Sequence, residues 1–277
     1  MTEQLAAVGR RLESVRQLEA VVTAMRAIAA SRARQSRKTL PGIRAFAAVI
    51  AGAIGRALPL LPAQDGDARI SQHSRVLILF TAEQGFAGAF TDRILEAATP
   101  LAAGAAVFLV GSRGATIAEQ RRLSPLWRTA MAPHIDGVSL VASRISEALS
   151  AHIATEGSDR VDLMFPVWSA GAMQVKTHCL LPFDYRRFTG ALRGQPPLTT
   201  LPPRTLLGRL SEEYVFAEIC EAAMLAFAAE NEARAAAMVS AKSNIERVRA
   251  ALEVLEHQVR QEEITAEVTE LCRAEPR

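Results

Sequence analysis

Two short segments have the residue types of a phosphate-binding loop. TAEQGFAGAF at 81–90 follows an apolar run and contains Gly85 and Gly88, and VGSRG at 110–114 follows another apolar run. A glycine-containing turn between a strand and a helix can bring backbone N–H groups to a phosphate. Neither segment completes a G-x-x-x-x-G-K-[ST] or G-x-G-x-x-G pattern, so we interpret both as tight strand-to-helix turns without a ligand.

Other patterns of catalytic residues are missing from the sequence as well. The five histidines have no metal-ligand spacing, and no serine lies in a G-x-S-x-G elbow. Four acidic residues near the C-terminus are typical of a solvated helix face rather than of acid and base catalysts: Glu262, Glu263, Glu267 and Glu270. We therefore predict no catalytic residue, no cofactor and no metal ion in this chain.

Basic residues gather at 25–38, MRAIAASRARQSRK. Such a density of Arg and Lys on one helix could bind the phosphates of a nucleic acid. The run lacks aromatic residues that would stack on bases, and an acidic segment of the same chain offers another partner. We favour pairing within the chain, or docking to an acidic protein, over nucleic-acid binding.

The composition is that of a globular protein with a real core, at 49% hydrophobic and 22% charged over 277 residues. The longest apolar runs, 45–55 and 101–111, are about half the ~20 residues of a membrane-spanning helix, and the N-terminus lacks a signal-peptide layout. We expect a cytosolic chain without a membrane span. Cys179, Cys220 and Cys272 are far apart and odd in number, so free thiols are expected.

Charge is divided unevenly along the chain. Residues 1–44 hold nine Arg and Lys against three Glu, a net charge of +6. Residues 206–277 hold eight Arg and Lys against fourteen Glu, a net charge of −6. Opposite charges at the two ends favour their lying side by side.

The C-terminal segment predicts a long helix with a coiled-coil seam. Residues 209–275 contain neither glycine nor proline, and a helix over this stretch would extend roughly 100 Å. Apolar residues recur there at alternating spacings of three and four. The spacing then jumps by five to Ile264, so we expect the helix tip to pack against a different partner. The seam residues are Met238, Ala241, Ile245, Val248, Leu252, Leu255 and Val259.

A similar apolar stripe lies at the N-terminus, partly within residues 10–40, which contain no glycine or proline. We predict that this helix pairs antiparallel with the longer C-terminal helix, whose end then projects unpaired. Pro41-Gly42 predicts an interruption of the N-terminal helix. The stripe residues are Leu5, Val8, Leu12, Val15, Leu18, Val22, Met25 and Ala29.

Between these arms, short apolar runs alternate with amphipathic segments. Buried parallel strands are predicted at 75–81 and 105–111, and further strands at 160–168 and 175–183. Helices are predicted at 88–99, 113–123 and 138–154. Such alternation indicates a Rossmann-like layered α/β domain, joined to the arms by proline-rich hinges at 59–68 and 194–204.

The predicted fold class is therefore α/β, with a long two-helix coiled coil added to the layered domain. The coiled-coil helices occupy residues 1–58 and 206–277, and the central α/β domain occupies residues 70–204.

Three stretches carry a resemblance to a known family. Residues 10–35, RRLESVRQLEAVVTAMRAIAASRARQ, combine an arginine and aliphatic pair, Ser-Val, and Thr-Ala-Met before a basic, alanine-rich turn. AENEARAAAMVSAKSN at 229–244 places an arginine four residues before the methionine of an Ala-Met pair. The most specific stretch is Arg260-Gln261 followed by Ile264-Thr265 and Glu267. With the two arms and the layered domain, nearly the whole chain resembles the gamma subunit of rotary F-type ATP synthases.

The chain departs from this family in the middle. The family's loop after the first strand usually reads Ser-Asp-basic-Gly-Leu-Cys-Gly-Gly-Phe-Asn, whereas residues 82–91 read AEQGFAGAFT. Pro41-Gly42 also stands inside the family's long first helix. These changes indicate a divergent branch of the family. One candidate for this branch is the alternative, sodium-translocating type of complex.

The resemblance implies a rotor shaft whose C-terminal helix runs inside a hexamer of alternating alpha and beta subunits. Carried over residue by residue, Arg260, Gln261 and Thr265 would contact loops of the catalytic beta subunits, and Met25 with Arg234 would face the acidic loop of those subunits. The layered domain would contact the epsilon subunit and the c-subunit ring. The chain itself would be a non-catalytic, peripheral subunit at the cytoplasmic face of the bacterial inner membrane.

Other classes of function stay open from the residues alone. A nucleotide-binding enzyme would bind a stoichiometric ligand at the two glycine-containing loops. A free-standing coiled-coil scaffold would dimerise through its arms, and the basic N-terminal arm could bind nucleic acid.

Overall fold

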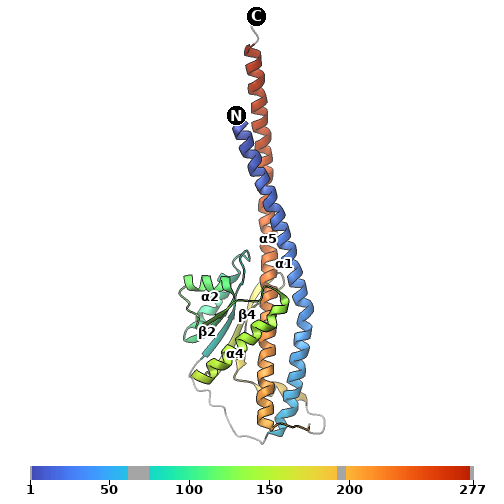
Figure 1. Cartoon of the computed structure of the whole chain (residues 1–277), viewed down its shortest axis with the longest axis vertical. Helices are drawn as coiled ribbons and strands as arrows, with labels where there is room; N and C mark the ends of the chain where they lie inside the picture. Colours follow the sequence, from blue (N-terminus) through green and yellow to red (C-terminus); the bar gives the residue numbers. More distant parts are fainter. Residues whose placement is uncertain (1, 62–74, 192–197, 275–277) are drawn as a thin grey trace. The chain divides into compact units, whose positions relative to one another are not determined.

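The computed structural model of the chain describes residues 2–61, 75–191 and 198–274. Two long helices, α1 (Thr2–Ala57) and α5 (Pro203–Ala274), each run through two compact units (Figure 1). The first unit combines residues up to Ala29 with those from Arg234 onward, and the second spans Ala30–Ala233. The prediction that the C-terminal helix is the longer one is confirmed, because α5 has 72 residues and α1 has 56.

In the first unit, the start of α1 lies beside the later part of α5, and α5 continues past the point where α1 begins (Figure 1). Val22, Met238 and Ile245 are buried together, with Met25 and Ala241 packed against them. Beyond the paired region, apolar side chains are open to solvent, with Ile264 54% and Val268 53% exposed. The predicted pairing of the two arms and the projecting tip are both confirmed.

The predicted seam is wrong at three positions. Leu18, Val248 and Leu255 are 51%, 46% and 39% exposed. Buried stripe residues lie on both sides of them, such as Leu12 and Val22 around Leu18, so each stripe stays at the interface. Two paired helices cover only a narrow strip of each other, and side chains at the margin of that strip remain open to solvent.

The helix α1 continues through Pro41-Gly42, contrary to the predicted interruption. Pro41 removes one backbone N–H, which costs about 3 kcal/mol in a helix interior. The adjacent Leu40 and Ile43 pack against the domain core, and Ile54 is fully buried further along. Full burial of a side chain of this size contributes about 1.5–3 kcal/mol, so Ile54 together with the partly buried Leu40 and Ile43 outweighs the lost hydrogen bond.

The second unit contains a five-stranded sheet with the order β3-β2-β1-β4-β5. Four strands are parallel, and β5 pairs antiparallel with β4. The strands are β1 (Arg75–Phe80), β2 (Ala105–Val110), β3 (Trp127–Thr129), β4 (Arg160–Ser169) and β5 (Ala172–Leu181). The helices between them are α2 (Phe90–Ala102), α3 (Ser112–Gln120) and α4 (Val138–Glu156).

The predicted layered α/β domain is confirmed, and each predicted strand and helix within it is found. The short edge strand β3 was missed, because Trp-Arg-Thr is neither an apolar run nor an alternating one. Of the predicted hinges, residues 62–68 and 194–197 lie outside the described residues. Residues 198–202 form no helix or strand, and α5 begins at Pro203.

Alternate residues of β1 face two different core layers. Ile78 and Phe80 pack in a layer with α4 and residues 219–227 of α5, whereas Leu77 and Leu79 pack in the layer of α2 and α3. Ala229 and Ala233 of α5 belong to this second layer, together with Ala82 and Ala87 of the loop after β1. The helix α5 therefore crosses from one face of the sheet to the other at the carboxyl ends of the strands.

Candidate functional site

The exposed tip of α5 carries three of the residues predicted to contact partners. Gln261, Ile264, Thr265 and Val268 have the i, i+3, i+4, i+7 spacing that places them on a single helix face, and all four are exposed. The Thr265 Oγ1 donates to the carbonyl of Gln261 at 2.8 Å. Arg260 is also exposed. This face combines apolar contact area with polar groups, which suits docking to another protein.

Arg260 is oriented along the helix by an ion pair. Its Nη2 lies 3.0 Å from Oε1 of Glu256, one turn earlier in α5. The guanidinium has five N–H donors, so this single contact leaves capacity for a carboxylate or carbonyl of a partner.

Met25 and Arg234, the other two predicted contact residues, are less exposed than the three at the tip. Met25 is partly buried against the Val22, Met238 and Ile245 cluster. Arg234 is only 6% exposed. The structure thus separates the five predicted residues into an exposed group at the tip and a largely covered pair.

The two glycine-containing loops are held by carboxylates of the chain itself. The backbone N–H groups of Glu83 and Gln84 each donate to the Glu230 carboxylate at 3.0 Å. The Glu83 carboxylate in turn accepts from the N–H and Oγ of Ser112, both at 2.9 Å, and from the N–H of Met131 at 2.7 Å. The backbone N–H groups of Glu83, Gln84 and Ser112, which could otherwise bind a phosphate, are therefore occupied.

The glycines of the second loop serve close packing. A Cβ atom on Gly114 would lie 1.8 Å from the Thr81 Oγ1, and Gly111 has a φ of 118° with a Cβ position 2.7 Å from the same oxygen. The Thr81 Oγ1 donates to the carbonyl of Val110 at 2.7 Å. Glycine is needed here so that α3 can approach the end of β1.

Sequence reasoning missed Glu83 and Glu230. Glu230 is 3% exposed within an alanine-rich stretch of α5. The available signal was a carboxylate placed directly after the apolar residues 222–229, since a carboxylate in such a stretch must find hydrogen-bond donors when it is buried. Its donors are far away in sequence, which is why the pattern did not reveal them.

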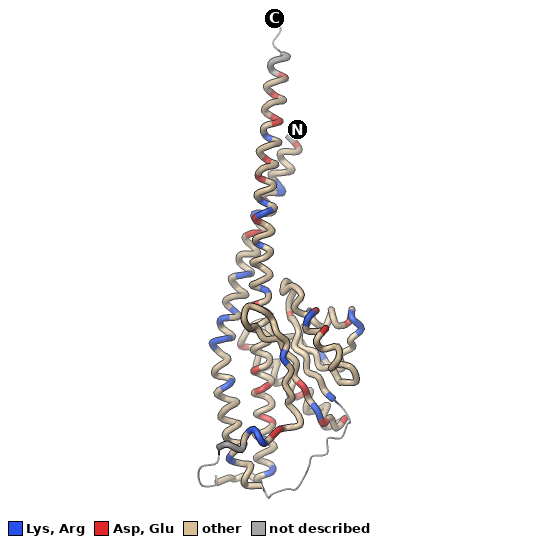
Figure 2. Tube along the Cα trace, turned by 180° about the vertical axis from the view of Figure 1, so that it is seen from behind, with Lys and Arg blue, Asp and Glu red and all other residues tan. Residues whose placement is uncertain are grey.

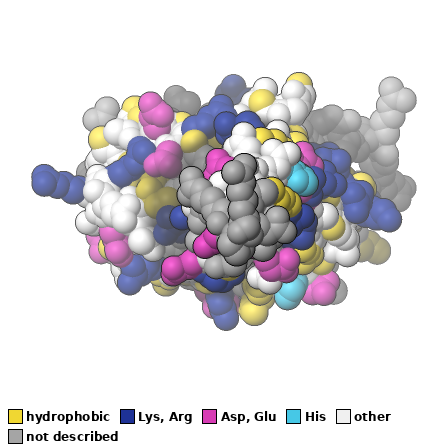
Figure 3. All heavy atoms as spheres, turned by 90° about the horizontal axis from the view of Figure 1, so that it is seen from above, with side chains coloured by type: hydrophobic (Ala, Val, Ile, Leu, Met, Phe, Trp, Pro, Cys, Tyr) yellow, Lys and Arg dark blue, Asp and Glu magenta, His cyan; other side chains and the backbone are white. Residues whose placement is uncertain are grey.

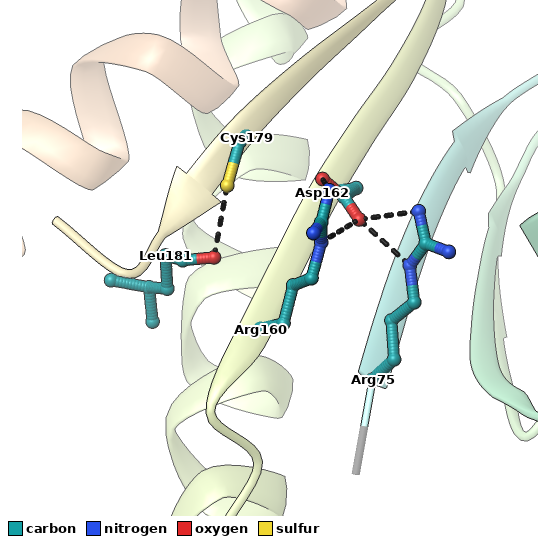
Figure 4. Close-up of polar contacts among 5 residues, drawn as sticks. All are labelled: Arg75, Arg160, Asp162, Cys179 and Leu181. Atoms are coloured by element: carbon teal, nitrogen blue, oxygen red, sulfur yellow. Dashed lines mark hydrogen bonds and ion pairs between the residues drawn. The ribbon is translucent and has the colours of Figure 1, made fainter. Parts of the chain in front are cut away.

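A second buried carboxylate lies at the opposite, amino-terminal edge of the sheet (Figure 4). Asp162 is 1% exposed, and its Oδ2 accepts from Nε of Arg75 at 2.8 Å and from Nε of Arg160 at 2.9 Å. Burial alone would raise the pKa of the Asp162 carboxyl, but hydrogen bonds and charge from Arg160 and Arg75 outweigh it and hold this pKa below its ordinary value. The group ties β1 to β4.

The described thiols are free, as predicted, but not activated. Cys179 lies opposite Asp162 in the β4–β5 ladder and its Sγ donates to the carbonyl of Leu181 at 3.1 Å (Figure 4). Desolvation and the Asp162 carboxylate raise the pKa of the Cys179 thiol, and burial raises that of Cys220 to about 11. Both thiols are therefore protonated near neutral pH. The side chain of Cys272 lies outside the described residues.

Among the residues that the structure describes, no group of three or more His, Cys, Asp and Glu side chains could hold a metal ion. By length and composition only, one helical segment, Glu3–Leu60, is long and apolar enough to cross a membrane. Core helices of soluble proteins meet the same criterion.

Fold and site together define a two-helix coiled-coil protein that carries an α/β domain and presents an exposed helix face for protein docking. A model of the ATP synthase family matches residues 4–274. The chain therefore belongs to the ATP synthase family.

Relatives of this chain are ATP synthase gamma chains, and the similarity extends over nearly their full length. The ATP synthase gamma chain of Streptomyces avermitilis is 28% identical, with 98% of this chain and 95% of that relative covered. The ATP synthase gamma chain of Symbiobacterium thermophilum is 24% identical, with 98% and 97% covered. The resemblance to the gamma subunit is thereby confirmed.

Solved structures share the fold. A chain in the OSCP/F1/c-ring structure of the Euglena gracilis mitochondrial ATP synthase aligns with a TM-score of 0.66 and 16% identity, covering 98% of this chain and 93% of that one. A chain of the Tetrahymena thermophila central stalk and c-ring structure aligns with a TM-score of 0.57 and 18% identity, covering 80% and 99%.

Proposed function

We propose that this chain is the central-stalk gamma subunit of an F-type ATP synthase, the shaft that couples rotation driven by ion flow to ATP synthesis or hydrolysis. The observation that carries the proposal is the match to gamma chains over 98% of the sequence, with 95–97% of those relatives covered. The solved relatives belong to structures of a rotor and of a central stalk.

The two paired helices have properties suited to transmitting twist. Arg209 to Ala274 of α5 contain no helix breaker, and Met238 and Ile245 seat this helix against Val22 of α1. A breaker-free helix resists local bending, whereas glycines would let it yield. Torque applied at one end of the first unit is therefore passed along the helices instead of being absorbed.

The tip face supplies the contact with the catalytic hexamer. Gln261 and Thr265, with Arg260 beside them, contact loops of the beta subunits in this proposal, and Ile264 and Val268 bury their exposed surface there. Met25 and Arg234 face the beta subunits' acidic loop. Because the shaft is asymmetric, it contacts the three beta subunits differently, and rotation changes which nucleotide state each one favours.

The remaining partners are the alpha subunits, the epsilon subunit and the c-subunit ring. The chain then lies peripherally at the cytoplasmic face of a bacterial inner membrane. The apolar residues of α1 have a protein partner, since Leu40 and Ile43 pack on the core of the second unit. This packing supports a shaft role for Glu3–Leu60 over insertion into a membrane.

Charge supports protein contacts over nucleic-acid binding. Basic residues lie along α1 and acidic residues along α5 (Figure 2). In the second unit, Arg37 of α1 pairs with Glu232 of α5, and Arg44 pairs with Glu221 at 2.8 Å. Figure 3 shows basic and acidic side chains interspersed on the face it presents. Two basic residues of the N-terminal arm are thus engaged within the chain.

A non-catalytic role is supported by the occupied loops. Backbone donors at Glu83, Gln84 and Ser112 are bound by carboxylates of the same chain, and catalysis in this proposal belongs to the beta subunits. The scaffold alternative loses its basis, because the arms pair within one chain.

The test uses assembled complexes reconstituted into vesicles. Ile245→Gly and Leu252→Pro should lower ATP-driven ion pumping per ATP hydrolysed without changing nucleotide binding, because each weakens the shaft. Val248→Ala is the matched control, since Val248 is 46% exposed and alanine favours the helix. Unchanged pumping with both shaft variants would refute the proposal. A second measurement is a pull-down of an affinity-tagged form of this chain from its native membranes, and failure to co-purify with alpha and beta subunits would also refute the proposal.

A further inference from the structure

The contact between α5 and the α/β domain lies where such folds hold ligands. The strand order places β1 between β2 and β4, so the chain moves from one side of β1 to the other at this point. In open α/β sheets, ligands bind outside the carboxyl ends of the strands at such a switch point. Here Ala229 and Ala233 of α5 pack at this edge against the loop after β1.

A row of carboxylates joins α5 to three successive loops. Glu230 of α5 accepts the N–H groups of Glu83 and Gln84, one on each carboxylate oxygen, in the loop after β1. Glu83 then accepts the N–H of Ser112, after β2, and the N–H of Met131, after β3. Two consecutive backbone donors converging on one anion is the arrangement of an anion receptor.

The apolar residues that α5 and the loop after β1 bring to this edge are alanines. Ala229 and Ala233 share the core layer with Ala82 and Ala87, and a single methyl group offers little to interlock. They bury surface but allow one element to slip along the other. Charge-assisted hydrogen bonds, which require one position of the carboxylate, determine where the loop sits on the helix.

We propose that Glu230 is a positioning residue whose carboxylate occupies the anion-binding position of the fold and fastens the loop after β1 to the shaft helix α5. The hydrogen bonds from the N–H groups of Glu83 and Gln84 to the Glu230 carboxylate are called the clasp. The inference rests on the proposed function in one respect: if α5 is the shaft, the clasp makes the α/β domain turn with it. The clasp itself is a property of the isolated chain.

The first test measures amide hydrogen exchange of Glu83 and Gln84 in the full chain. Glu230→Ala should speed exchange at both amides by at least about tenfold, since hydrogen bonds to charged groups are among the stronger ones. Glu232→Ala is the matched control, because Glu232 lies two residues away and pairs with Arg37 of α1. It should leave both amides unchanged. Glu230→Gln, which keeps the side-chain length and one acceptor, should give a smaller acceleration.

Chemical rescue separates an anion receptor from a general loss of packing. Formate, a small carboxylate, should restore slow exchange in Glu230→Ala, whereas chloride at equal ionic strength should not. Unchanged exchange in both Glu230 variants, equal acceleration in Glu232→Ala, or no effect of formate would each overturn the proposal.

The second test uses assembled complexes. Glu230→Ala should lower ion pumping per ATP hydrolysed severalfold, and Glu232→Ala should not. Fast exchange with unchanged pumping would overturn the torque role of the clasp. A chain that shows the exchange pattern but never assembles with alpha and beta subunits would instead contradict the proposed function and leave the clasp standing.

Discussion

Arg249 of α5 donates from its Nη1 to Oε2 of Glu19 on α1, with 2.7 Å between the two atoms. The pair stands one residue beyond Leu18 and Val248, which the stripe pattern assigned to the interface and which are exposed instead. An ion pair inside an apolar seam favours one register of the two helices over others.

This pair should show measurable coupling. In a double-mutant cycle of Glu19→Ala and Arg249→Ala, we expect a coupling energy of about 0.5–1 kcal/mol, since both side chains are partly exposed. Urea unfolding of the four chains measures it. Exchanging the charges, Glu19→Arg with Arg249→Glu, should recover most of the loss. Strictly additive single effects would show that the pair contributes nothing.

Asp162→Asn should destabilise the chain by about 1.5–3 kcal/mol at neutral pH, because it removes the charged acceptor of the hydrogen bonds from Arg75 and Arg160, whose side chains are themselves partly exposed. The folded-state pKa of Asp162 is lowered, so its contribution is complete above the ordinary value of about 3.9 and is lost as pH falls through the lowered pKa. The stability gap between wild type and variant should therefore narrow below about pH 4. Denaturant unfolding over a pH series measures this gap, and a gap independent of pH would contradict the assignment.

Pro41→Ala should stabilise the chain by about 2 kcal/mol. It restores the backbone N–H that α1 lacks, worth about 3 kcal/mol, while giving back up to about 1 kcal/mol of unfolded-state entropy. Pro59→Ala is the control, since Pro59 stands in the first turn of a short 3-10 helix, where proline is tolerated. Thermal unfolding compares the two variants. An equal effect of both would show that the backbone hydrogen bond missing at Pro41 does not lower the stability of the chain.

Gln261→Ala and Thr265→Ala should leave the stability of the isolated chain within about 0.5 kcal/mol of wild type, because both side chains are exposed. In assembled complexes, both should lower the ATPase rate severalfold if this face meets the beta subunits. Glu270→Ala is the control, because nine residues place it half a turn from Gln261 around the helix. Rates that fall equally with Glu270→Ala would argue against a specific docking face.

Element type and order were readable from the residues for physical reasons. Buried parallel strands such as β1 are continuous apolar runs. A long stretch without glycine or proline, such as α5, can be predicted as a helix without knowing what packs against it. The three residues of β3 carry no such pattern, and pairing with β2 alone makes them a strand. Likewise, Pro41 predicted a break that packing on both sides overrides.

The tip motif was also visible in the sequence, whereas the clasp was not. Gln261 and Thr265 are neighbours along one helix, so their shared face follows from spacing. Glu83 and Glu230 lie 147 residues apart and meet only because α5 crosses the carboxyl edge of the sheet.

By itself, the amino-acid sequence determined the long helices, the strands other than β3, the opposite charges of the two arms and the family. These properties depend on local periodicity and composition, which can be read without knowing which segments pack together in the fold. Only the tertiary structure decided which residues of the stripes face inward, that α1 passes through Pro41, and that carboxylates fill the loops that could have held a phosphate. Each of these depends on contacts between segments distant in sequence, whose packing and hydrogen bonds outweigh local preference.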